Sequence, residues 1–209
     1  MPVSRERRRW RRGRSAGNRR DGGLWASPAH AEYAAMDVDG VRLYVGSGTE
    51  KREGWISVDA NPDLNPHVVA FADRLPMFGD ETVAAIEACH LFEHLTFDEA
   101  RAALKEWRRV LVPGGQLMLE LPNLRRCLEL LGQHLDQDGF DLALIGIFGW
   151  PPAIRTEGVW QIHKWGWTPE TLSQELLSSG FRNAEVVPIQ QTWRPAARID
   201  RDMRIHATK

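Results

Sequence analysis

Short apolar runs alternate with longer amphipathic stretches along the chain from about residue 41 to the C-terminus. The first four runs are rich in valine and isoleucine and end on glycine, aspartate, proline or histidine, which is typical of strands buried on both faces of a sheet. A fifth run follows the first amphipathic stretch, and two more lie near the end. The predicted strands are VRLYVGSG (41–48), WISVDANP (55–62), PHVVAFAD (66–73), TVAAIEACH (82–90), QLMLELPN (116–123), FRNAEVVPI (181–189) and DMRIHATK (202–209).

Amphipathic stretches between these runs predict helices with recognisable starts and ends. Thr96 and Glu99 can form a capping box, in which each side chain accepts a hydrogen bond from the other residue's backbone N–H. That helix should end at VPGG (112–115), because proline lacks a donor and glycine allows positive φ. A later helix should begin after Thr168, with a proline at its first position, and end at Gly180. Between them, a further helix is predicted from an apolar stripe of Leu124, Cys127, Leu128, Leu131 and Leu135.

Strands that alternate with helices and then end in a strand pair predict an α/β fold. We expect a Rossmann-like doubly wound sheet, mostly parallel, with an antiparallel strand near the C-terminus. One connection is unusual, because only eleven positions separate Gly48 from Asp59, too few for a turn, a helix and a strand. The helix after the first strand should therefore be shortened or absent. A Trp- and Gly-rich insert is predicted at about 139–167.

Charge divides the chain into two parts. Residues 1–20 hold nine arginines and one acid, a net charge of +8, so the other residues, with 18 bases and 27 acids, carry −9. Such a basic arm can bind nucleic acid or an anionic surface, or it can be a disordered leader. We interpret residues 1–35 as a disordered basic arm and residues 36–209 as the folded domain. The segment WASPAHAEYAAM (25–36) has the pattern of a short helix.

The remaining composition fits a globular protein, with 43% hydrophobic and 26% charged residues. No apolar run approaches the roughly 20 residues that cross a bilayer, and no secretory signal follows the charged start. Cys89 and Cys127 lie in apolar patterns without the spacing of a metal site, so we expect buried thiols rather than a disulfide. These features predict a cytoplasmic protein without a membrane span.

Candidate binding residues follow the strands, because ligands of open α/β sheets bind beyond the carboxyl ends of the strands. Gly46, Ser47 and Gly48 follow the first strand and would let a ligand approach the backbone closely. Asp59 ends the second strand, where an acid can hold a ribose diol, and Asp73 ends the third, where it can hold an adenine amino group. Aspartates also end strands as simple turn formers, so the pattern leaves both interpretations open.

The order and spacing of several motifs add a family resemblance. The series LYVGSG, GWISVDANP, ADRLPM, HLFEHL, EWRRVLVPGGQLMLELPN and HKWGWTPETLSQELLSSGF resembles the class I S-adenosylmethionine-dependent methyltransferases. It is most similar to the small bacterial type whose glycine motif runs directly into a GW-I-x-VD strand. The resemblance extends from about Val41 to the C-terminus, and it implies S-adenosylmethionine as the cofactor.

The resemblance also implies roles for individual residues. Gly46, Ser47 and Gly48 would line the methionine part of the cofactor, and Asp59 with Ala60 would bind its ribose. The remaining cofactor-binding residues would be Asp73 and Arg74 near the adenine, His90 and Leu91 under the reacting end, and His94 in the EH motif, which could instead only stabilise its turn.

The loop TEKREG (49–54) takes the place of the usual helix between the glycine turn and Asp59. This departure suits S-adenosylmethionine, which has no phosphate and needs the dipole of a helix N-terminus less than a dinucleotide does. It disfavours NAD, whose Gly-x-Gly-x-x-Gly motif is broken here by Lys51.

A hydroxyl acceptor benefits from a base with a pKa near 7, which favours histidine. The candidates are His163, in QIHKWGW, and His90. His163 has tryptophans around it in the sequence, which could close over a sugar or flat ring or could simply belong to the core. We therefore expect methyl transfer to an oxygen of a small-molecule or glycan-type acceptor. The alternatives are a nucleic-acid methyltransferase recruited by the arginine arm and a non-catalytic nucleoside-binding member of the fold.

Overall fold

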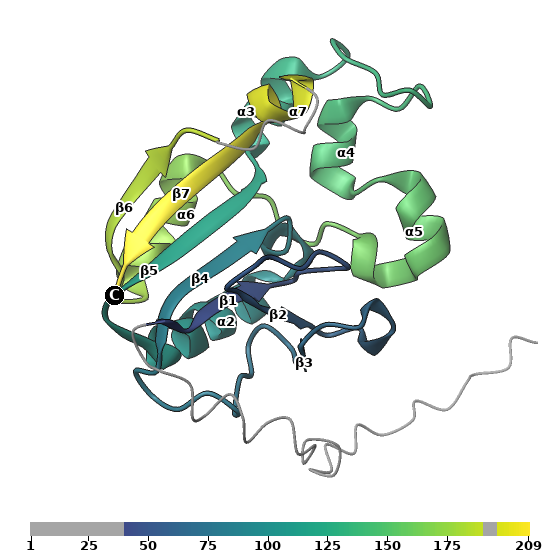
Figure 1. Ribbon diagram of the computed structural model, residues 1–209. Coiled ribbons are helices and arrows are strands. Elements are labelled where there is room, and N and C mark those ends of the chain that lie inside the picture. The colour runs from purple at the N-terminus through teal and green to yellow at the C-terminus, as the bar shows by residue number, and fades with distance from the viewer. Residues whose placement is uncertain (1–39, 190–195) are drawn as a thin grey trace, which may run out of the picture.

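The computed structural model describes residues 40–189 and 196–209. Seven strands form one sheet in the order β3-β2-β1-β4-β5-β7-β6 (Figure 1). Strand β7 runs antiparallel to β5 and β6, and all other neighbouring strands are parallel, so the predicted sheet is confirmed. The bounds are β1 Arg42–Val45, β2 Ile56–Asp59, β3 Val68–Val69, β4 Val83–Cys89, β5 Leu111–Pro122, β6 Arg182–Val187 and β7 Asp202–Thr208. The predicted arm at 1–35 and the predicted helix at 25–36 lie outside the described residues.

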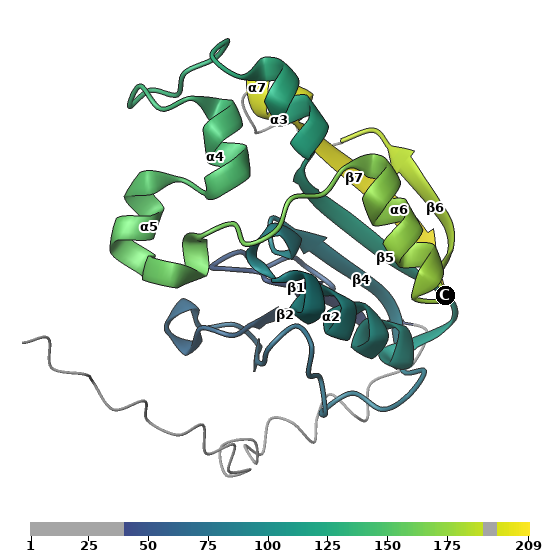
Figure 2. The ribbon, with the colours of Figure 1, turned by 180° about the vertical axis from the view of Figure 1, so that it is seen from behind.

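Helices α2 (Phe97–Val110) and α6 (Pro169–Ser178) cover one face of the sheet (Figure 2). The predicted capping box of α2 is present: the Thr96 hydroxyl accepts from Glu99 N at 3.3 Å, and Glu99 Oε2 accepts from Thr96 N at 2.8 Å. The apolar side of α2 packs onto the sheet, and its Trp107 is fully buried. Amphipathic patterning and caps therefore place this layer as the sequence predicts.

The other face of the sheet has no helix between β1 and β2, as predicted; residues 46–55 form a loop instead (Figure 1). The loop lies over the sheet through Arg52, whose guanidinium is 3.8 Å from the centre of the Tyr44 ring. Arg52 also forms ion pairs with Glu50 at 2.7 Å and with Glu87 on β4 at 3.0 Å. Polar contacts thus cover a surface that a helix covers in a doubly wound sheet.

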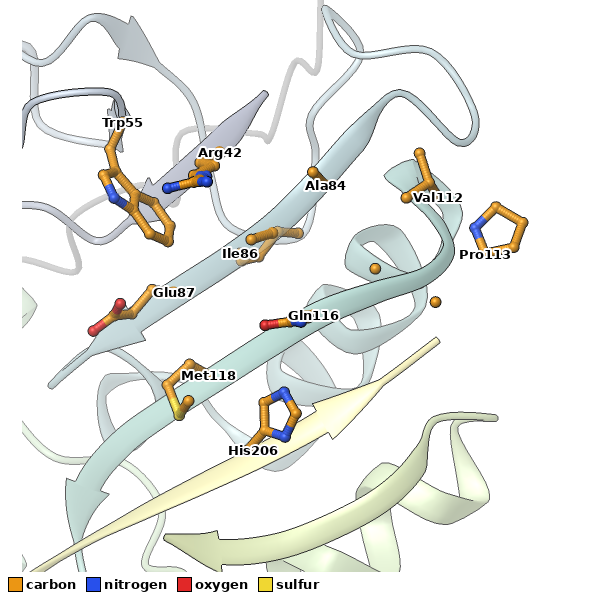
Figure 3. A pocket seen from close by; sticks show the side chains of 13 residues that line it. Arg42, Trp55, Ala84, Ile86, Glu87, Val112, Pro113, Gln116, Met118 and His206 are labelled. Atoms are coloured by element: carbon orange, nitrogen blue, oxygen red, sulfur yellow. The ribbon is translucent and has the colours of Figure 1, made fainter. Parts of the chain in front are cut away.

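A groove lies on this same face, near the amino ends of the parallel strands (Figure 3). Its lining includes Arg42, Trp55, Glu87, Gln116, Met118 and His206. Ligands of such sheets bind at the carboxyl ends, so this groove is separate from the site described below.

Two predicted elements differ in the structure. Helix α3 spans only Leu124–Leu130, and the predicted stripe is wrong, because Leu128, Leu131 and Leu135 are 60%, 50% and 65% exposed. Cys127 is fully buried where α3 packs on α4, and a side chain added at Gly146 of α4 would lie 2.7 Å from its Sγ. Two short helices packed through small residues replace one long amphipathic helix.

The second difference is β3, which is shorter than predicted and pairs only at Val68 and Val69. The chain then turns, with Arg74 N donating to Phe71 O, and the Ala72 carbonyl accepts from the Trp107 indole at 2.8 Å. Ala70 N still donates to Asp59 O at 3.0 Å, but beyond it these bonds to a turn and a helix replace the sheet pairing that the sequence predicted for residues 71–73.

The predicted insert contains α4 (Leu142–Phe148), α5 (Pro151–Glu157) and the 3-10 turn η4 (Gly158–Gln161), while α7 (Ala196–Arg201) precedes β7. Figure 1 shows α4 and α5 beyond the carboxyl end of β4. Both cysteines are buried thiols, as expected. None of the helices in residues 40–189 and 196–209 has the length and apolar character needed to cross a bilayer.

Candidate active site

The glycine turn after β1 packs directly against the segment that follows β4. Gly46 has φ +69°, and a Cβ added there would lie 2.7 Å from the Leu91 Cβ. Gly48 also has positive φ, +56°, but its added Cβ would meet open space. Gly46 is therefore required by conformation and by packing, and its contact with Leu91 brings two predicted site segments together.

Asp59 holds the other side of this turn. Its Oδ2 accepts from Gly48 N at 2.8 Å, and its Oδ1 accepts from Asn61 N at 2.9 Å. Because each carboxylate oxygen can accept more than one hydrogen bond, both keep capacity for two hydroxyl groups. Asp59 and Ala60 are half-buried, and Ser47 is buried. The structure thus joins Gly46, Ser47, Gly48, Asp59, Ala60 and Leu91 at the carboxyl ends of β1, β2 and β4.

Asp73 and Arg74 lie in the turn beyond β3, and both are exposed. Within the described residues, no hydrogen bond links their side chains to the glycine turn. Their predicted position near an adenine stays a prediction.

His90 follows β4 directly, has φ +52°, and lies between two acids. Its Nδ1 is 2.8 Å from Glu93 Oε1, and its Nε2 is 3.2 Å from Asp202 Oδ2 on β7. Burial opposes the charged ring, but these two carboxylates outweigh it and raise the pKa of His90 to about 9. The imidazolium form, which cannot accept a proton, is thus favoured at neutral pH. Asp202 has no sequence signal, because 112 positions separate it from His90.

The segment around His163 folds back onto the 3-10 turn η3 (Phe92–His94), which follows β4. Lys164 N and Trp165 N both donate to Glu93 O, at 2.8 and 3.3 Å. The rings of His94 and His163 meet edge to face, with centroids 4.7 Å apart. One ligand atom from each of Glu93, His94 and His163 lies within 4.8 Å of the other two, so the EH motif and the distant histidine form one cluster.

His163 is held in a defined orientation. Its Nδ1 is 2.8 Å from Gly146 O in α4, so Nδ1–H donates and Nε2 carries the lone pair. Burial lowers the pKa of His163 below its ordinary value, which favours the neutral ring at pH 7. This histidine can therefore accept a proton or bind a cation through Nε2.

The tryptophans predicted around His163 have different surroundings. Trp167 is 1% exposed and packs against Phe92, with ring centroids 5.5 Å apart, so it belongs to the core. Trp160 is 54% exposed and stacks on Phe71 at 6.4 Å. The core interpretation holds for Trp167, whereas Trp160 offers an aromatic surface to an acceptor.

Comparisons with known proteins agree with this architecture. A sequence profile described as a methyltransferase domain matches residues 23–119. Similar solved structures include S-adenosylmethionine-dependent methyltransferases from Archaeoglobus fulgidus (20% identity, TM-score 0.54, 83% of this chain and 88% of that chain) and Mesorhizobium loti (17%, 0.56, 83% and 93%). A Haloferax volcanii putative methyltransferase in complex with the Trm112 methyltransferase activator is also similar (15%, 0.54, 86% and 88%). At these identities the structures show the shared fold. No curated protein matches the sequence.

The residues at the carboxyl ends fit S-adenosylmethionine. Gly48 faces open space, Asp59 has oxygens with remaining acceptor capacity for a ribose diol, and Leu91 gives an apolar wall. The matched region contains all three of these residues. Residues 23–119 thus match a methyltransferase domain, and the chain shares the fold of S-adenosylmethionine-dependent methyltransferases.

Proposed function

We propose that the protein methylates a hydroxyl oxygen of a small-molecule or glycan-type acceptor, and that His163 activates that oxygen. The observation that carries the proposal is the His163 ring itself. Its Nδ1–H donates to Gly146 O, its ring meets that of His94 in the turn that follows β4, and burial lowers its pKa, which favours the neutral form with a lone pair on Nε2. A neutral, oriented imidazole is the group that removes a hydroxyl proton near pH 7.

The cofactor-binding residues are proposed from the same end of the sheet. Gly46, Ser47 and Gly48 line the methionine part, Asp59 and Ala60 bind the ribose, and the turn after β3 borders the adenine through Asp73 and Arg74. Leu91, His90 and His94 lie toward the reacting end. When bound, S-adenosylmethionine supplies an electrophilic methyl group, whose bond electrons stay on sulfur as the acceptor oxygen bonds to carbon.

His90 receives a positioning role in this proposal. As an imidazolium between Glu93 and Asp202, it holds η3 against the start of β7 and cannot take a proton at neutral pH. The hydroxyl proton therefore passes to His163 Nε2, where no charged partner occupies the lone pair. Trp160 and Phe71, stacked and half-exposed, supply a surface on which a sugar ring can pack.

The test uses the full chain and the variant His163→Ala. Titration calorimetry with S-adenosylhomocysteine should give the same affinity for both proteins. Turnover on an acceptor found by screening hydroxylated small molecules and glycans should fall by roughly 100- to 10,000-fold in the variant, the usual contribution of a general base. His134→Ala, at an exposed histidine outside the cluster, is the matched control.

Two outcomes would contradict the proposal. Unchanged turnover in His163→Ala would remove that residue from the chemistry. Product mass that locates the methyl group on nucleic acid, with activity that falls steeply as salt rises, would favour recruitment through the arginine arm instead.

A further inference from the structure

We propose that Glu93, His94 and His163 form a binding site for a divalent first-row transition-metal ion next to the acceptor position. The inference rests on the proposed methyl transfer to a hydroxyl oxygen, but it gives His163 the role of a metal ligand in place of a base. It also gives His94 and the second carboxylate oxygen of Glu93 a part in the activation of that hydroxyl.

Both histidines have the orientation of metal ligands. His163 Nδ1 lies 2.8 Å from Gly146 O, and His94 Nδ1 lies 3.2 Å from Ile162 O. Each Nδ1–H therefore donates to a backbone carbonyl, and each Nε2 keeps its lone pair. Metal-bound histidines in proteins nearly always donate their other ring N–H in this way, which fixes the tautomer and the ring direction.

Glu93 supplies the negative charge. It is 2% exposed, and its Oε1 is 2.8 Å from His90. No hydrogen-bond donor of the described residues reaches its Oε2, although that atom is buried. An unpartnered buried carboxylate oxygen costs free energy, so its persistence indicates a ligand.

The three ligand atoms converge from two separate segments. Glu93 and His94 lie on η3, while His163 comes from the insert, which is fixed there by Lys164 N donating to Glu93 O. The ligand atoms lie within 4.8 Å of one another. Ligands at about 2.1 Å from one ion are at most about 4.2 Å apart, so the cluster has about the size that one ion needs.

The donor set selects the kind of metal. Two imidazoles and one carboxylate suit Zn²⁺, Fe²⁺ or Co²⁺ better than Mg²⁺, which prefers oxygen ligands and retains its waters. Three protein ligands leave coordination positions open, as in catalytic sites. A hydroxyl bound there would have a lowered pKa and release its proton to water, and His163 would then act as a ligand instead of taking the proton itself.

The experiment is Co²⁺ titration of the chelator-treated full chain, followed by visible absorption and by calorimetry with Zn²⁺. We expect one metal ion per chain in the wild type and in His134→Ala. His94→Ala and His163→Ala should each bind at least about tenfold more weakly and lose the absorption bands of bound cobalt. Far-UV circular dichroism and urea denaturation of the same samples without metal verify that each variant is folded.

Binding that is unsaturable, or equal in His94→Ala, His163→Ala and the wild type, would overturn the metal site. Methyl transfer that persists after chelation but disappears in His163→Ala would also overturn it, while leaving the base mechanism in place. Saturable metal binding without any methylated product would instead contradict the proposed function and support the site. The two failures are therefore distinguishable.

Discussion

The Asp59 side chain holds the glycine turn, and in the proposed site it also binds the ribose. In Asp59→Ala, Gly48 N and Asn61 N lose an acceptor that each reaches at 2.8 and 2.9 Å. A hydrogen bond to a charged group contributes about 1.5–3 kcal/mol, but Asp59 is only half-buried and water can replace part of it. We expect the free energy of unfolding to fall by about 1–2 kcal/mol in total.

Cofactor affinity should fall by more than the stability does, because the substitution removes the proposed ribose acceptor and also loosens the glycine turn. Loss of a paired polar contact costs about 1–3 kcal/mol, which corresponds to roughly 5- to 150-fold weaker binding. Calorimetry with S-adenosylhomocysteine measures the affinity, and urea denaturation measures the stability. Asp59→Asn, which keeps one acceptor oxygen, should give an intermediate loss.

Asp63→Ala is the matched control, because Asp63 is an exposed acid four positions away in the next turn. It should bind S-adenosylhomocysteine like the wild type. A folded Asp59→Ala protein with unchanged affinity would refute the assignment of Asp59 to the ribose. An equal loss of affinity in Asp63→Ala would show that binding depends on the local negative charge and not on a contact made by Asp59.

Three other predictions follow from the structure. Gly46→Ala and Gly48→Ala each place a side chain at positive φ, which should lower the free energy of unfolding by about 1–2 kcal/mol. Only the side chain added at Gly46 meets Leu91, so urea unfolding should show a further loss of about 1–3 kcal/mol for Gly46→Ala. Burial disfavours the Glu106 carboxylate, but Arg109 and Leu75 N outweigh it and lower the pKa of Glu106. The stabilisation by the Glu106 carboxylate is present above the unfolded pKa of 4.5 and is lost as pH falls through the lower folded pKa. The difference in urea midpoint between wild type and Glu106→Gln should therefore shrink below the folded pKa. Trp160→Ala should raise KM for the acceptor without changing S-adenosylhomocysteine affinity; an unchanged KM would place the acceptor elsewhere.

Local signals in the sequence predicted most of the fold. The capping box at Thr96 and the residues that start α6 act within one helical turn, so their physics is visible in a short window. The absence of a helix between β1 and β2 was also predictable, because the eleven positions that separate Gly48 from Asp59 are too few to hold one. The long helix predicted from the apolar residues after Leu124 is wrong, because apolar periodicity does not show whether a partner surface exists, and Leu128 remains exposed.

The site was only partly predictable, for a different reason. Glycines and acids at strand ends can be read from position, but the charge state of a histidine depends on partners that are distant in sequence. Glu93, three positions away, and Asp202, which reaches His90 from β7, together raise the pKa of His90, whereas burial against α4 lowers the pKa of His163. Both histidines look equivalent in the sequence, and only their surroundings separate a positioning role from a proton acceptor.

The loop that replaces the usual helix changes how the cofactor must be held. Gly46 N and Ser47 N donate to Val58 O, and Gly48 N donates to Asp59, so these three amides are already used inside the protein. They cannot also hold the carboxylate of the methionine tail, as amides at a helix N-terminus could. The glycine turn would therefore let the cofactor lie close to the backbone without donating hydrogen bonds to it. If the cofactor binds as proposed, its affinity must then depend on side chains, and the proposed ribose ligand Asp59, which is also bonded to the turn, should be the residue on which the shortened pocket depends most.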